Sequence, residues 1–143
     1  PTLDGIAYMA KYQPGDYGAI QWLNANVTGS PAILEASGGQ YSDYGRIATF
    51  TGLPTVLGWG GHELQWRGNY TEPGKREPDI DNIYKTLDKG TALNLLKKYN
   101  VTYVIVGRME REKGYEATAL AKFRGFMDVV YDKQGTVIYR VRE

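Results

Sequence analysis

The chain has no cysteine and only one histidine among its 143 residues. The absence of cysteine excludes disulfide bonds, thiolate metal sites and cysteine nucleophiles. No apolar run approaches the roughly 18 residues that indicate a membrane-spanning helix. Neither sign of charge is in excess, because 17 Lys and Arg balance 16 Asp and Glu to a net charge of +1. This balance argues against nucleic acid as a partner.

Several catalytic motifs are also missing. Gly38-Gly39 and Gly58-x-Gly60-Gly61 match neither the dinucleotide-binding nor the P-loop spacing. No serine lies in a nucleophile-elbow context. The single histidine, His62, does not complete an HExxH motif, because Trp66 stands where the second histidine would be. We therefore expect no cofactor, no metal and no catalytic residue in this chain.

Helical and strand patterns alternate along the chain, which predicts a single α/β domain over residues 1–143. The best strand is VTYVIV at 101–106, whose continuous β-branched run is typical of a central strand covered on both faces. We predict a three-layer α/β/α domain with a mixed, mainly parallel sheet and an antiparallel C-terminal hairpin. Helices are expected over 16–24, from 79 onward, over 91–99 and over 115–123. Strands are expected over 32–36, 46–50, 55–57, 101–106, 126–131 and 136–141.

The window 43–67 has the most unusual composition in the chain. It holds the only histidine, two of the three tryptophans, two arginines and five glycines. Tryptophan and arginine are favoured where a surface grips a ligand or partner. Loops of about twenty residues in a compact domain are usually functional or disordered. We therefore predict a ligand-binding site here, with the candidate residues Arg46, Trp59, His62, Glu63, Trp66 and Arg67.

The same residues allow two interpretations. The indole rings of Trp59 and Trp66 suit a sugar ring, and Arg46 with Arg67 could hold a phosphate or carboxylate bidentately. In the alternative, His62 and the arginines pin a long loop through carbonyls and carboxylates. Structural ion-pair networks contain the same residue types as functional sites.

Other polar residues have local explanations. Asp16 can cap the first helix, and Asp43 can cap exposed amides in the turn 42–45. The mixed charges of 108–112 follow the central strand, at the favoured ligand position of open α/β sheets. Mixed-sign charge in such a place is more often a solvated network, which we take as the first expectation.

Separate stretches across nearly the whole chain form a wider pattern, of which GLPTVLGW…HE…WR at 52–67 is the most specific. The others are 3–5 with 8–9, 14–24, 46–55, 79–84, and 98–107 with 110–111. This pattern resembles the C-terminal soluble part of the archaeal and chloroflexal "YYY" membrane proteins, large polytopic proteins of glycosyltransferase-like, GT-C character. A wider resemblance is to the soluble domain of the oligosaccharyltransferase catalytic subunit. There, two tryptophans precede the Asp-Tyr-Gly motif, whereas here Tyr41-Ser42 takes their place.

These resemblances imply an accessory domain, because the catalytic carboxylate and metal of GT-C enzymes lie on loops between membrane helices. They imply a parent protein in the cell membrane, with this domain as an extracytoplasmic fragment that begins at Pro1. The implied partners are the transmembrane portion of the same polypeptide and a lipid-linked sugar or glycan. Three Asn-x-Thr sequons, at Asn26, Asn69 and Asn100, hint at an exported face, although such triplets are also ordinary turn chemistry.

Three functional hypotheses follow from the sequence. In the first, the domain helps to position a lipid-linked sugar or acceptor through its 58–67 loop. In the second, it is a structural or interaction module with no ligand that packs on the membrane part. The third is a self-sufficient hydrolase that uses His62 and Glu63. The isolated domain is expected not to be catalytic, whereas its parent would be a glycosyltransferase.

Overall fold

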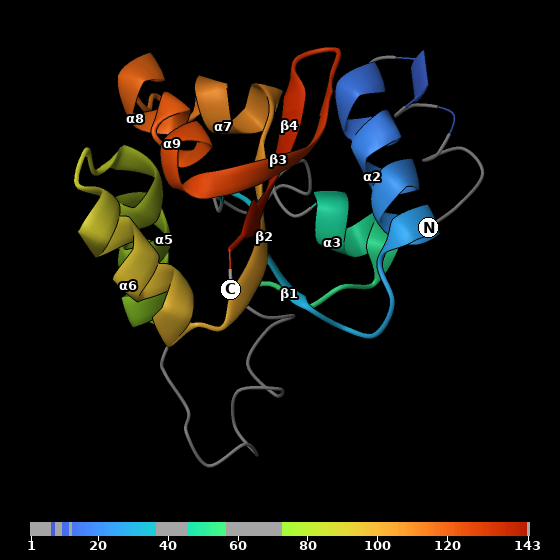
Figure 1. The fold of residues 1–143 in the computed structure, drawn as a ribbon. Helices are drawn as coiled ribbons and strands as arrows, with labels where there is room; N and C mark the ends of the chain where they lie inside the picture. The colour runs from blue at the N-terminus through green and yellow to red at the C-terminus, as the bar shows by residue number, and fades with distance from the viewer. Residues whose placement is uncertain (1–6, 8–9, 12, 37–45, 57–72, 143) are drawn as a thin grey trace.

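A four-stranded mixed sheet forms the centre of the domain. Its strands are β1 Ala32–Leu34, β2 Val101–Val106, β3 Met127–Lys133 and β4 Thr136–Val141, in the order β1-β2-β4-β3 (Figure 1). The β1 and β2 strands are parallel, whereas β4 runs antiparallel to both β2 and β3. This computed structural model describes residues 7, 10–11, 13–36, 46–56 and 73–142.

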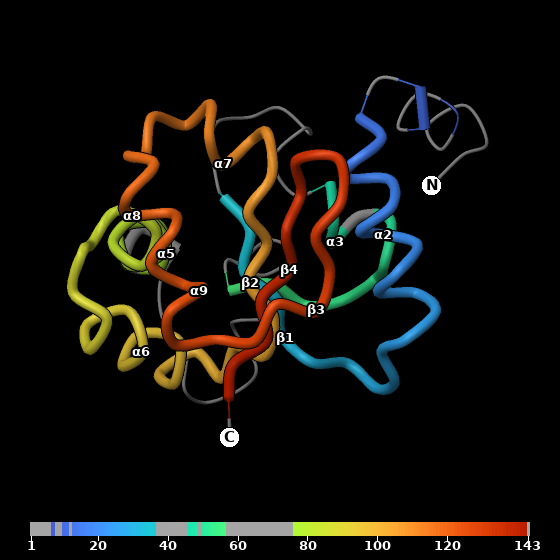
Figure 2. Tube along the Cα trace, turned by 45° about the horizontal axis from the view of Figure 1, so that its top comes forward, coloured from blue at the N-terminus to red at the C-terminus, as the bar shows by residue number. Residues whose placement is uncertain are grey.

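Helices cover both faces of the sheet (Figures 1 and 2). They are α2 Pro14–Asn26, α3 Arg46–Thr51, α5 Pro73–Lys85, α6 Lys89–Lys98, α7 Arg108–Glu112, α8 Ala117–Ala121 and α9 Phe123–Phe126. Tyr103 and Ile105 of β2 pack with the α2 and α3 core residues, whereas Val104 and Val106 pack with those of α5, α6 and α8. Because side chains alternate between the faces of a strand, β2 serves both cores. The predicted three-layer α/β/α arrangement is confirmed.

The position of the strands confirms part of the predicted sheet and corrects the rest. Val101–Val106 is an interior strand, between β1 and β4, and the antiparallel C-terminal hairpin is present. The expectation of a mainly parallel sheet is wrong, because β4 lies between β2 and β3 and makes two of the three strand pairings antiparallel.

Two predicted strands are not strands. Residues 46–50 belong to α3, because the Glu35 carboxylate accepts from the amides of Ile47 and Ala48 and so satisfies the exposed N–H groups of a helix start. Thr55 forms only an isolated parallel bridge with Ile33. Residue 57, the end of the other predicted strand, lies outside the described residues.

The predicted helices are present, with different limits. Pro14 stands at the first helical position of α2, where its missing amide costs nothing, so Asp16 lies in the first turn instead of capping. The α5 helix begins earlier than predicted and continues through Pro78. The predicted helix 115–123 is divided into the short helices α8 and α9.

Tyr84 of α5 ties a helix to the parallel pair of strands. Its buried hydroxyl lies 2.7 Å from the carbonyl oxygen of Ile105 and 3.1 Å from that of Leu34. Burial raises the pKa of this phenol well above its ordinary value, so the hydroxyl stays a hydrogen-bond donor. The ring also stacks on Tyr115 and meets Phe123 edge-on. Tyr84 therefore fixes α5 over the junction of β1 and β2.

The α2 helix lies close to the β3–β4 turn at Gly15. A Cβ atom there would lie 2.4 Å from the Gln134 carbonyl oxygen and 2.6 Å from Thr136 Oγ1. We expect Gly15→Ala to lower the free energy of unfolding by about 1–3 kcal/mol, because the helix must move away from the turn. Urea unfolding measures this loss.

Gly90→Ala is the matched control, since Gly90 is also helical but an added Cβ would meet nothing closer than 3.7 Å. This variant should be neutral or more stable by about 0.5–1 kcal/mol. Equal effects of the two substitutions would show that the α2–turn contact is not a tight one.

Candidate functional site

Charged side chains from four segments meet at one edge of the sheet. Glu35 follows β1 directly, and Glu110 lies on α7, which follows β2. Because β1 and β2 are parallel, their carboxyl ends lie at the same edge. Asp16 comes to this edge from the first turn of α2, and Arg46 is the first residue of α3.

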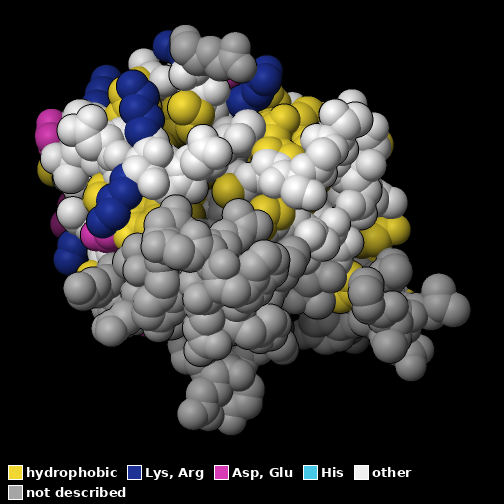
Figure 3. All heavy atoms as spheres, turned by 90° about the horizontal axis from the view of Figure 1, so that it is seen from below, with side chains coloured by type: hydrophobic (Ala, Val, Ile, Leu, Met, Phe, Trp, Pro, Cys, Tyr) yellow, Lys and Arg dark blue, Asp and Glu magenta, His cyan; other side chains and the backbone are white. Residues whose placement is uncertain are grey.

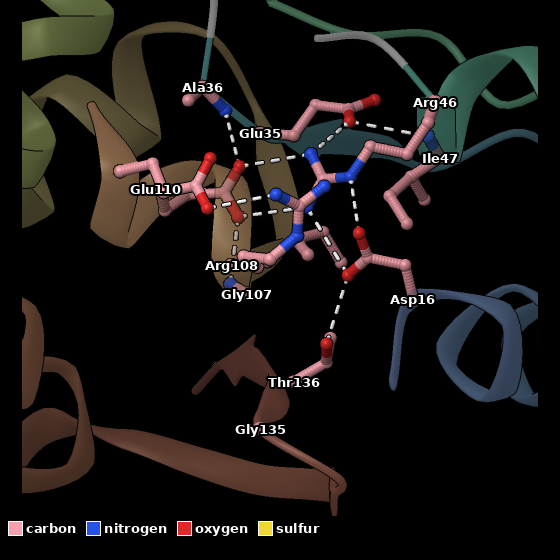
Figure 4. Close-up of polar contacts among 12 residues, drawn as sticks. Asp16, Glu35, Ala36, Arg46, Ile47, Gly107, Arg108, Glu110, Gly135 and Thr136 are labelled. Atoms are coloured by element: carbon pink, nitrogen blue, oxygen red, sulfur yellow. Dashed lines mark hydrogen bonds and ion pairs between the residues drawn. The ribbon is translucent and has the colours of Figure 1, made fainter. Parts of the chain in front are cut away.

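Arg46 lies between the three carboxylates (Figure 4). Its Nε is 2.9 Å from Asp16 Oδ2, its Nη1 is 2.9 Å from Glu35 Oε1, and its Nη2 is 2.9 Å from Glu110 Oε1. The Arg46 side chain is only 2% exposed. We refer to Asp16, Glu35, Arg46 and Glu110 as the Arg46 cluster.

Further donors complete the coordination of the carboxylates. Thr136 donates its hydroxyl to Asp16 Oδ1 at 2.9 Å. Glu110 accepts from the amides of Gly107 at 2.7 Å and Ala36 at 2.8 Å. Since Glu35 caps the start of α3, every carboxylate oxygen of the cluster accepts a hydrogen bond. Such full pairing is what allows buried charges to persist in a protein interior.

The cluster has one guanidinium for three carboxyl groups, and this imbalance sets its electrostatics. Burial raises the pKa of Glu35, and Arg46 opposes that shift. Burial also disfavours the charged form of Arg46, but Glu110 and Glu35 outweigh it and hold the pKa of Arg46 well above its ordinary value. Arg46 is therefore a permanent cation, and Glu35 is the carboxyl group whose ionisation burial penalises.

The chemistry of the Arg46 cluster is that of a structural anchor. Its side chains are between 0% and 3% exposed, and their polar atoms are already engaged with one another. The cluster holds Ala36 and Arg46, the two described residues on either side of segment 37–45. These contacts agree with the second interpretation of Arg46 given above, in which the arginine pins the chain through carboxylates instead of binding a ligand. Its role in binding a ligand stays a prediction.

The other predicted site residues lie outside the described part of the chain. They are Trp59, His62, Glu63, Trp66 and Arg67, and their assembly into a binding loop stays a prediction. The described residue nearest to them in the sequence is Val56, whose carbonyl oxygen accepts from Arg76 Nη1 at 2.6 Å.

Sequence reasoning missed the partners of Arg46. Glu110 was expected in a solvated network but is fully buried, whereas Arg108 and Glu112 do form an exposed pair at 2.8 Å. Glu35 carried a usable signal, because it is a carboxylate at the end of an apolar run that reads as a buried strand. A buried acid of this kind requires a cationic partner, and Arg46 is the next arginine along the chain.

The described regions contain neither a metal site nor a membrane span. Among these residues, no three His, Asp or Glu side chains are grouped so that they could hold a metal ion. Within the same regions, no helix is both long enough and apolar enough to cross a membrane.

Comparison with known proteins identifies a shared fold. No family model matches the chain, and no curated protein matches it. Among solved structures, it is similar to the C-terminal globular domain of the oligosaccharyltransferase from Archaeoglobus fulgidus, with a TM-score of 0.58 and 13% sequence identity. The alignment covers 89% of this chain and 97% of that one. This likeness shows the fold. At the level of the fold, it supports the resemblance to the soluble domain of the oligosaccharyltransferase catalytic subunit. The resemblance to the "YYY" proteins stays a prediction.

The buried position of Arg46 predicts a large loss of stability in Arg46→Met. Removing the cation leaves three buried carboxylates without their partner, which should cost about 3–5 kcal/mol. Arg124→Met is the control, because the Arg124–Asp132 pair is exposed and should contribute only about 0–1 kcal/mol. Urea unfolding of both variants measures the difference. Similar losses would mean that the cluster contributes no more than a surface pair.

The raised pKa of Glu35 predicts a pH dependence. Because the folded pKa lies above the unfolded one, ionised Glu35 carries a penalty that disappears as the pH falls through the folded pKa toward the ordinary value of 4.5. We expect the stability of Glu35→Gln relative to the parent chain to rise as the pH increases from about 4.5 to about 7. Urea unfolding across this range tests it. Glu112→Gln, at an exposed site, should show a smaller dependence, and a relative stability of Glu35→Gln that falls with pH would contradict the assignment.

Proposed function

We propose that this chain is an accessory extracytoplasmic domain of a membrane-embedded glycosyltransferase-like protein of GT-C type. The observation that carries the proposal is the fold shared with an oligosaccharyltransferase C-terminal globular domain across 89% of the chain. The sequence pattern that resembles the "YYY" membrane proteins supports the same conclusion. The parent protein would reside in the cell membrane, and the transmembrane portion of the same polypeptide would be this domain's first partner.

In this proposal, the 58–67 loop helps to position a lipid-linked sugar or an acceptor. Trp59 and Trp66 would stack on a sugar ring, and Arg67 would pair with a phosphate or carboxylate. His62 and Glu63 would donate to and accept from hydroxyl groups. The Arg46 cluster gives the sheet edge a rigid base, since it joins α2, α3 and α7 to the end of β1.

The chemical step is assigned to the parent protein and not to this domain. The acids of the described cluster are occupied by Arg46 and by backbone amides, so none of them is positioned to act on a substrate. GT-C enzymes carry their catalytic carboxylate on loops between membrane helices. The domain would therefore bind and orient the lipid-linked sugar or the acceptor, and the membrane part would transfer the sugar.

A second function is favoured by the closure of the Arg46 cluster. Arg46, one of the predicted ligand-binding residues, is engaged by three carboxylates. If Arg67 and His62 are engaged in the same way, the loop is a structural element that packs on the membrane part and binds no ligand.

Trp66→Ala and Arg67→Ala separate these two functions. If the loop binds a ligand, both variants should weaken binding of polyprenyl phosphate in detergent micelles, with little change in melting temperature. If the loop is structural, they should instead cost about 1–3 kcal/mol of stability, because buried partners lose their hydrogen bonds. Isothermal titration calorimetry and thermal melts measure the two effects.

Arg142→Ala is the matched control, since Arg142 forms an exposed pair with Asp128. It should change neither the affinity for polyprenyl phosphate nor the melting temperature appreciably. A large loss of stability in the loop variants without any loss of binding would retire the ligand-binding function.

A further inference from the structure

A groove lies between α2 and the β3–β4 hairpin, apart from the Arg46 cluster. Its volume is about 500 Å³, which is within the range of small-molecule sites. Three aromatic side chains, Tyr17, Trp22 and Tyr131, line it together with Gln21, Lys133 and Gln134. All three aromatic residues are half-buried, so each presents part of its ring to the groove.

The aromatic rings are held in place by the fold. Trp22 meets Tyr103 of β2 edge-on, with ring centroids 6.2 Å apart and an interplanar angle of 74°. Gln21 Nε2 donates to the Tyr17 hydroxyl at 3.0 Å. Tyr131 comes so close to α2 that a Cβ at position 18 would lie 2.1 Å from its hydroxyl oxygen, a contact that only Gly18 permits. The groove is therefore preformed, which lowers the entropic cost of binding.

The charge of the groove is unusual for a surface. Among the 13 residues of α2, the only charged one is Asp16, and it is buried in the Arg46 cluster. Lys133 is the single cation among the described lining residues, which include no Asp or Glu. In Figure 3, by contrast, Lys and Arg side chains gather on the side of the molecule where α5 and α6 lie. The groove thus offers aromatic faces, amide groups and one ammonium group.

We propose that the α2–β3 groove binds a short oligosaccharide. Sugars present flat C–H faces that pack on aromatic rings and hydroxyl groups that pair with amide side chains. The Tyr17, Trp22 and Tyr131 rings supply the faces, and Gln21 and Gln134 supply the amides. Lys133 donates to ring and hydroxyl oxygens. The α2 residues that line the groove include no charged side chain, which suits a neutral sugar.

This site goes beyond the proposed function, because it uses no residue of the 58–67 loop. A glycan held in the groove would be a second contact, alongside the one assigned to that loop. The two proposals fail independently, and an experiment that locates the bound sugar tells them apart.

The test is an NMR titration of the isotope-labelled 143-residue chain with trisaccharides. Binding is monitored through the amide chemical shifts. The probes are neutral trisaccharides of glucose, of mannose and of N-acetylglucosamine, each up to about 20 mM, which would detect a dissociation constant in the millimolar range. We expect at least one to shift amides of residues 17–22 and 131–134. Tyr17→Ala should weaken that binding by about 3- to 10-fold, as expected for the loss of one stacking ring.

Matched variants give the controls. Lys133→Ala should weaken binding, whereas Lys97→Ala removes an exposed lysine from α6 and should leave it unchanged. The proposal is overturned if no trisaccharide shifts the groove amides, or if the shifts fall on 58–67 alone. Shifts confined to the groove would support this site and count against a sugar-binding role for the loop.

Discussion

The fold depends on one buried cation. Arg46 is held by Asp16 of α2, by Glu35, which follows β1, and by Glu110 of α7. Taking these charges out of water is expensive, and only complete pairing offsets that cost. The benefit is geometric, because the N–H donors of a guanidinium point in fixed directions. Each carboxylate must therefore lie opposite its own N–H donor. The cluster therefore sets how α2, α3 and α7 sit at the carboxyl ends of β1 and β2.

This arrangement separates support from recognition. The Arg46 cluster is closed to solvent, and the residues proposed to meet a sugar, those of segment 58–67 and of the α2–β3 groove, are not members of it. The α2 helix belongs to both regions, since its Asp16 is anchored to Arg46 and other residues of the helix form one wall of the groove. This separation agrees with the proposed accessory function, in which the domain would bind a sugar and the membrane part would carry out the chemistry.

Much of the fold could be predicted from local patterns, and the failures have a common cause. The β-branched run at 101–106 and the apolar periodicity of the 91–99 region identified β2 and α6 correctly. The sequence of 46–50 reads as a strand, but Glu35 caps it as a helix from outside the segment. Similarly, the hairpin was predicted, yet nothing within it indicates that β4 pairs with β2. The Arg46 cluster was missed for the same reason: its partners lie 11, 30 and 64 residues from Arg46.

The hydrogen bond between Thr136 and Asp16 has a consequence for the order of folding. It joins residues 120 positions apart, so Asp16 can accept this bond only after residue 136 has been synthesised. Contacts of such long range slow folding, because the chain entropy of closing the loop is lost before the contact forms. During synthesis, α2 would leave the ribosome long before its hairpin partner, with the Asp16 carboxylate still hydrated. The domain is therefore expected to fold late and as a whole, with the hydrogen bond from Thr136 to Asp16 among the last contacts to form.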